Sequence, residues 1–71
     1  MKIGDLLLRE QESYDGIYYN VGVILDAQPE MHDLYQVFWY TGAVGENPQW
    51  FLERVVKSWY KVAQRFLNKP R

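Results

Sequence analysis

The stretch Leu34-Tyr35-Gln36-Val37-Phe38-Trp39-Tyr40 carries the strongest structural signal in this 71-residue chain. It is rich in β-branched and aromatic residues, which is typical of a β-strand. Successive side chains of a strand point to opposite faces, so Tyr35, Val37 and Trp39 share one face. We expect that face to lie in the core and the opposite face to point outward.

Shorter strand signals lie on both sides of this stretch. Residues 3–9 and 20–27 precede it, and residues 49–52 follow it. Segments 11–16 and 41–48 separate these signals, because the first is polar and ends in Asp-Gly while the second contains two glycines and a proline. We expect both segments to be loops. Short strands at this spacing are typical of a small barrel.

The apolar period changes from two to 3.6 after Leu52, which indicates an amphipathic helix. Basic residues occupy the sector of this helix opposite the apolar residues. Val55-Val56 retains strand character and Ser58 is a competent N-cap, so we place the barrel at residues 1–56 and the helix at residues 57–68. The apolar positions are Leu52, Val55, Val56, Trp59, Val62, Ala63, Phe66 and Leu67.

These elements predict a single domain of the α+β class, mainly β. It consists of a small barrel of about five antiparallel strands followed by a C-terminal amphipathic α-helix. A chain of this size buries only about 60% of the surface that its unfolded form exposes, so its core is small. A ligand pocket of roughly 300–1,000 Å³ would consume much of that core.

Composition excludes several classes of protein. The chain has no cysteine, so it has neither a disulfide framework nor a thiolate metal site. No apolar run approaches the roughly 20 residues of a membrane span, and we expect a cytoplasmic protein. The sole histidine, His32, lies in a polar turn, and Gly42-Ala43-Val44-Gly45 lacks the Lys-Ser/Thr of a phosphate-binding loop. We therefore predict no catalytic residues, no metal site and no cofactor, and a protein that is not an enzyme.

Charge is divided unevenly along the chain. Residues 1–53 contain nine acidic and two basic residues, a net charge of −7. Residues 54–71 contain six basic residues and no acidic ones, a net charge of +6. Such asymmetry indicates either a segment that binds a partner or a basic segment that folds against the acidic body.

The order of the strand segments resembles that of small Src-homology-3-like barrel proteins encoded by bacteriophages, with KOW- or Tudor-like features. The resemblance covers residues 1–56 and implies a five-stranded barrel in a phage accessory protein of the host cytoplasm. The opening Gly-Asp and the glycine in the second strand also look like the KOW motif of ribosomal and transcription proteins. The matching segments are Met1-Lys2-Ile3-Gly4-Asp5-Leu6-Leu7, Gly22-Val23-Ile24-Leu25-Asp26, Tyr35-Gln36-Val37-Phe38-Trp39 and Trp50-Phe51-Leu52-Glu53.

The aromatic residues are the first candidate binding site. Twelve aromatic rings are too many for the interior of so small a barrel, so some of them must be exposed. In Src-homology-3-like barrels an aromatic groove binds proline-rich or extended peptides, and the resemblance implies the same here. The alternative is that the C-terminal helix covers these rings. The candidate residues are Tyr18, Tyr19, Phe38, Tyr40 and Trp50.

The basic face of the helix is the second candidate. It consists of Arg54, Lys57, Lys61 and Arg65. Three partners fit it, namely an acidic protein patch, nucleic acid or a membrane surface, and the alternative is a solvated outer face. We expect a non-enzymatic interaction module that binds a host or phage protein, with nucleic-acid binding as the second possibility. The chain is either a monomer or a homodimer in which strands pair edge to edge.

Overall fold

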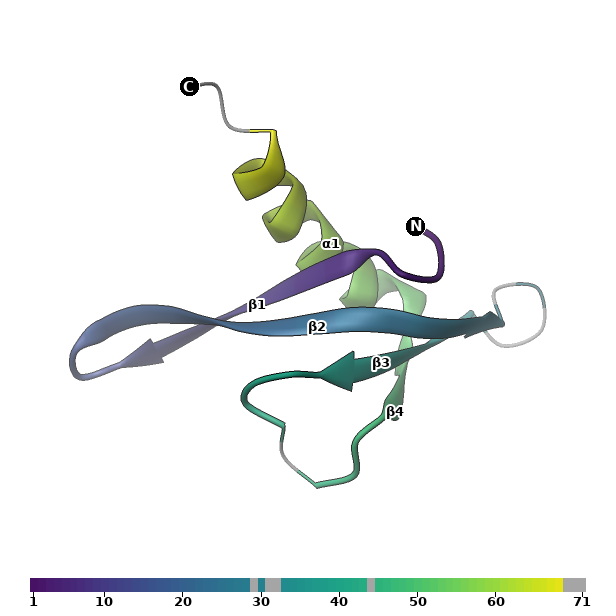
Figure 1. Cartoon of the computed structure of the whole chain (residues 1–71), viewed down its shortest axis with the longest axis horizontal. Coiled ribbons are helices and arrows are strands. Elements are labelled where there is room, and N and C mark those ends of the chain that lie inside the picture. The colour runs from purple at the N-terminus through teal and green to yellow at the C-terminus, as the bar shows by residue number, and fades with distance from the viewer. Residues whose placement is uncertain (29, 31–32, 44, 69–71) are drawn as a thin grey trace.

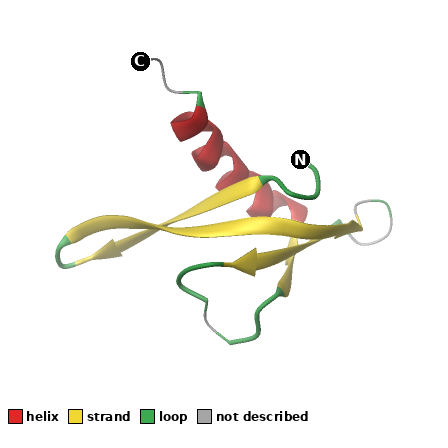
Figure 2. Ribbon diagram, in the orientation of Figure 1, coloured by secondary structure: helices red, strands yellow, loops and turns green. Residues whose placement is uncertain are grey.

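The computed structural model describes residues 1–28, 30, 33–43 and 45–68. Its four antiparallel strands each pair with the next along the chain and curl into a half-barrel, and a helix follows them (Figures 1 and 2). This confirms the α+β class. The elements are β1 (Leu6–Ser13), β2 (Gly16–Gln28), β3 (Leu34–Trp39), β4 (Gln49–Leu52) and α1 (Glu53–Leu67).

The predicted core face of β3 is confirmed. Tyr35, Val37 and Trp39 are at most 5% exposed, and they pack with residues from β1, β2 and α1. Alternation along each strand sets this composition, because every second side chain points into the half-barrel. The buried cluster consists of Leu7, Ile24, Tyr35, Val37, Trp39 and Val56.

A β-bulge in β2 adjusts this alternation. The pairing of β2 with β3 shifts by one residue between Ile24 and Asp26. The extra residue, Leu25, is exposed, while Ile24 is buried and Ala27 packs against the core three positions later. The bulge therefore keeps apolar side chains on the core face at a spacing that a regular strand would not allow.

Gly22 is required where β2 crosses Trp39. The two residues are cross-strand partners, and a Cβ atom at position 22 would lie 2.7 Å from Cε3 of the indole ring. Any other residue would therefore displace the largest ring of the core.

The prediction of about five strands is wrong, since the described residues form four. The helix begins at Glu53, directly after β4, so residues 53–56, which were expected to finish the barrel, are helical. Val56 is fully buried from a helical position. Ser58 does not cap the helix, because its hydroxyl donates to the carbonyl of Val55 within the first turns.

The loop predicted at residues 11–16 is also wrong. β1 and β2 remain paired as far as Ser13 and Gly16, with only Tyr14 and Asp15 in the turn. We call residues 10–19 the hairpin arm, and Figure 1 shows that it extends beyond the rest of the sheet. The arm is mostly solvent-exposed on both faces, so its strands need no apolar alternation and read as a polar loop in the sequence.

Helix α1 packs against β1 and covers the core side of the half-barrel. Val56 and Ala63 lie seven residues, or about two turns, apart in α1, and both are fully buried. Trp59 lies between these two positions and meets the rings of Trp39 and Phe51 edge to face, with both centroid distances 5.0 Å. Such aromatic pairs add about 0.5–1.5 kcal/mol each to the free energy gained from burial.

Replacing Trp59 with alanine is expected to lower the free energy of unfolding by about 3 kcal/mol, because it removes both ring contacts and leaves a void beneath the helix. Urea denaturation followed by circular dichroism measures the loss. The control is Tyr14→Ala in the exposed hairpin turn, which should change the free energy by no more than about 0.5 kcal/mol. A loss for Trp59→Ala as small as that of the control would contradict the packing described.

Candidate functional site

The sheet is apolar on both of its faces. The face opposite the core, which we call the outer face, has two rows of cross-strand neighbours. One row joins Leu6, Val23 and Phe38, and the other joins Leu8 and Val21 to Tyr40, whose amide donates to the carbonyl of Val21 at 2.8 Å. Trp50 of β4 belongs to the same face, since it lies opposite Gln36. Towards the hairpin arm this face meets α1, since Glu10 and Tyr19 lie beside Phe66, whereas Tyr40 and Trp50 are exposed.

Three of the five predicted aromatic residues lie on the outer face. Phe38 and Tyr40 meet edge to face with ring centroids 5.2 Å apart, and Tyr40 is 64% exposed. Trp50 is 37% exposed. The structure thus combines large apolar area with solvent access in these rings, as in side chains that anchor protein interfaces.

The other two predicted residues belong to the hairpin arm. Tyr19 contacts Phe66 near the end of α1, with ring centroids 5.0 Å apart and the planes inclined by 75°. Tyr18 points to the opposite side of β2 and is half exposed. The five rings therefore do not form one groove, and of these five only Tyr19 stacks on a ring of the helix.

The four basic residues of the second candidate form a single stripe along α1. Arg54, Lys57, Lys61 and Arg65 are all exposed and recur every three or four residues, which places them on one side of the helix. At 1.5 Å per residue the stripe is roughly 16 Å long. None of the four forms a hydrogen bond with a carboxylate among the described residues.

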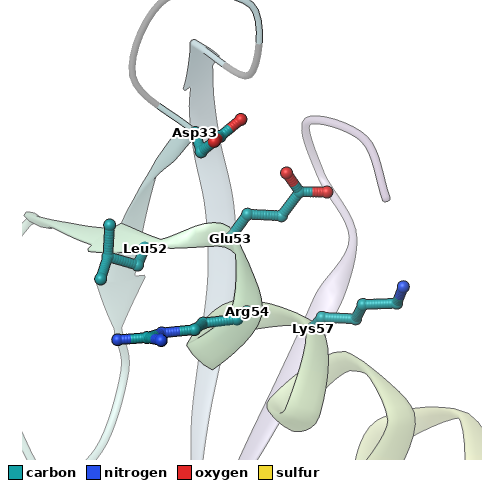
Figure 3. Close-up of a pocket in the computed structure, with 5 residues that line it drawn as sticks. All are labelled: Asp33, Leu52, Glu53, Arg54 and Lys57. Carbon is teal, nitrogen blue, oxygen red and sulfur yellow. The ribbon is translucent and has the colours of Figure 1, made fainter.

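An open surface cavity of about 370 Å³ lies where β3 begins and α1 starts. Asp33, Leu52, Glu53, Arg54 and Lys57 line it (Figure 3). Arg54 and Lys57 extend in opposite directions, so the charged groups do not converge on one point.

Tyr35, a buried residue of β3, lies near the acidic side of this cavity. Burial raises the pKa of Tyr35, and the carboxylates of Glu53 and Asp33 raise that pKa further. The hydroxyl is therefore neutral at physiological pH.

A polar and aromatic cluster at the other end of the sheet was not predicted. The guanidinium of Arg9 lies over the ring of Trp39 at 4.2 Å and faces the ring of Trp59 at 5.8 Å. Its Nη2 donates to the carbonyl of Gly42 at 2.8 Å. Strand alternation contained the signal, because Arg9 shares a face with the buried Leu7.

The segment between β3 and β4 is held against the sheet by further side-chain bonds. The amide group of Asn47 accepts from the backbone N–H of Trp39 at 2.9 Å and donates to its carbonyl at 2.8 Å, as a neighbouring strand would. Thr41 accepts from the N–H of Val21. Two buried donors in this cluster, Nε of Arg9 and Nε1 of Trp39, have no hydrogen-bond partner.

Within the described part of the chain, no group of three or more acidic or histidine side chains is placed to hold a metal ion. No described helix is long and apolar enough to cross a membrane. His32 lies outside the described residues.

No protein-family model, curated protein or solved structure matches this chain.

Replacing Arg9 with alanine is expected to lower the free energy of unfolding by about 2 kcal/mol, since it removes a cation–π contact and a charged hydrogen bond. Arg9→Lys should recover less than half of this loss, because an ammonium cannot stack flat on Trp39. Chemical denaturation measures both variants, with Glu12→Ala on the same strand, β1, as the control. Equal stability of the lysine variant and the wild type would show that charge alone accounts for the contact.

Proposed function

We propose that this protein is a non-enzymatic interaction module that binds a partner protein through the outer face of its sheet. The observation that carries the proposal is the pair of rings formed by half-buried Phe38 and exposed Tyr40 on an apolar face of the sheet. Exposed apolar patches on a small folded domain mark interaction surfaces, because their exposure to water opposes stability unless a partner covers them.

The charges around the outer face favour a partner segment that is not acidic. The only basic residue in the four strands, Arg9, belongs to the core side. The acidic residues Glu10 and Asp26 lie at the margins of the outer face, opposite Tyr19 and Gln36. An apolar or proline-rich segment with a neutral or basic flank fits this surface better than an acidic one does.

The proposal includes a phage accessory role in the host cytoplasm, with a host or phage protein as the partner. This part is supported by the resemblance of residues 1–56 to phage-encoded barrels.

Peptides selected from a random displayed library are expected to bind the outer face. In an NMR titration of the labelled protein, the largest amide shifts should map to Phe38, Tyr40 and Trp50. Tyr40→Ala should weaken binding at least tenfold, about 1.4 kcal/mol, while substitution of the fully exposed Tyr14 in the hairpin turn, Tyr14→Ala, should leave affinity unchanged. Shifts confined to residues 54–65 would contradict the proposal.

Nucleic-acid binding is the second candidate, and the basic stripe of α1 favours it. If the stripe binds phosphates, titration with duplex or single-stranded DNA should shift the amides of residues 54–65, and the affinity should fall steeply as salt is raised. The double substitution Lys61→Glu and Arg65→Glu should then abolish binding without unfolding the protein. We expect no such shifts at near-physiological salt, since the acidic body of the protein repels a polyanion.

A further inference from the structure

The hairpin arm exposes apolar side chains that do not stabilise the core. It extends beyond the rest of the sheet (Figure 1), and none of its residues belongs to the buried cluster. Ile17, Tyr18 and Tyr19 are nevertheless 57%, 50% and 37% exposed. Large apolar side chains gathered on the surface of a small domain mark an interaction site, since they are not needed there for packing.

The base of the arm is held from both of its faces. On one face the ring of Tyr19 meets that of Phe66 edge to face, with centroids 5.0 Å apart. On the other face Arg9, which directly precedes the arm, stacks over Trp39 at 4.2 Å. Strand pairing then continues without a register shift as far as the turn. The arm therefore has a fixed direction before any partner binds, which lowers the entropic cost of binding.

One face of the arm is divided lengthwise into an acidic row and an apolar row. Cross-strand partners share a face of the sheet, and Glu10 pairs with Tyr19 while Glu12 pairs with Ile17. The two glutamates follow β1, and the two apolar side chains follow β2 at a distance of roughly 5 Å. All four residues are exposed, so both rows are accessible to a partner.

The apolar row ends at a cavity between the arm and the end of α1. The cavity has a volume of about 250 Å³ and is lined by Glu10, Tyr19, Val62, Arg65 and Phe66. Phe66 is 52% exposed there. An apolar side chain that entered this cavity would contact both aromatic rings, so the base of the arm offers an anchor point for a partner.

The charges of the arm indicate a basic partner. The arm contains three acidic residues and no basic residue, a net charge of −3, which would repel an acidic protein segment or a nucleic acid. A second copy of this chain does not supply the matching pattern. The basic stripe of its helix lies opposite the fully buried Val56 and Ala63, so those charges are not flanked by an exposed apolar row of the same length.

The spacing of the two rows favours a helical partner. Side chains four residues apart on a helix are separated by roughly 6 Å along its axis. This is close to the roughly 7 Å between alternate residues of a strand, such as Glu10 and Glu12. A helix can therefore present a basic row and an apolar row side by side, whereas one face of a single extended strand presents only one row.

We propose that this face of the hairpin arm binds a basic amphipathic helix of a partner protein. Lysine or arginine side chains of that helix lie over Glu10 and Glu12, and its apolar side chains lie over Ile17 and Tyr19. This surface is separate from Phe38 and Tyr40, and the proposal does not depend on binding there.

An NMR titration of the labelled protein with two synthetic helical peptides tests the proposal. The first repeats Leu-Lys-Ala-Ala, which places leucine and lysine in neighbouring rows of a helix. The second repeats Leu-Ala-Lys-Ala, which has the same composition but places the two on opposite sides. At near-physiological salt the first peptide should shift the amides of residues 10–19 and bind at least tenfold more tightly than the second.

Two double variants separate local contacts from the overall charge of the protein. Glu10→Gln combined with Glu12→Gln should weaken binding of the first peptide at least tenfold. The matched control is Glu30→Gln combined with Glu46→Gln, which removes the same charge from exposed positions outside the arm and should change the affinity less than twofold. Circular dichroism verifies that both variants are folded.

Several results would overturn the proposal. Equal affinity for the two peptides, or equal loss in the two double variants, would show that charge alone accounts for binding. Shifts confined to Phe38 and Tyr40, or no binding at millimolar peptide, would exclude the arm. Shifts in the arm that depend on protein concentration without peptide would assign it to a second copy. The outer-face proposal fails separately, because Tyr40→Ala tests it on a residue outside the arm.

Discussion

The edge-to-face packing of Trp59 against Trp39 and Phe51 is the interaction on which this fold depends. A four-stranded sheet curled into a half-barrel leaves one side of its core open to water, and in the described residues α1, not a fifth strand, follows β4. One helix supplies the cover through Val56, Trp59 and Ala63. In a chain that buries so little surface, this single layer of rings replaces what a longer barrel would obtain from an additional strand.

The position of the helix also determines what the surface displays. Because α1 packs Val56, Trp59 and Ala63 against the sheet, its basic stripe faces solvent, while Phe66 and Leu67 at the end of the apolar stripe are more than half exposed. On the outer face of the sheet, Tyr40 and Trp50 remain exposed in the described structure, and Phe38 is half-buried. The strand that decides the fold therefore carries aromatic side chains on both faces.

Local patterns were sufficient to predict the core face of β3 and the helical period after Leu52. Tyr35, Val37 and Trp39 alternate regularly, and the helix keeps the spacing of Val56, Trp59 and Ala63. The start of the helix was placed too late because β-branched Val55-Val56 suggests a strand, whereas burial against the sheet overrides that propensity. Among the site residues, exposure of Tyr40 followed from alternation. Alternation also places Arg9 on the core side, but its stacking partner Trp39 lies on a distant strand. The contact of Tyr19 with Phe66 and the bonds of Asn47 with Trp39 are likewise not encoded by a local pattern.

The length of the hairpin arm can change without altering how the rest of the sheet and the helix pack. Beyond the pair Glu10 and Tyr19 it touches neither the helix cover nor the buried cluster, and regular pairing continues to Ser13 and Gly16. One residue added to or removed from each strand of the arm preserves every pairing below it, whereas a change in a single strand forces a bulge or inverts the faces. Evolution or engineering can therefore lengthen or shorten this arm, or replace its sequence, provided that residues change in cross-strand pairs. Such changes alter how far the hairpin extends and leave the buried cluster and the helix unchanged.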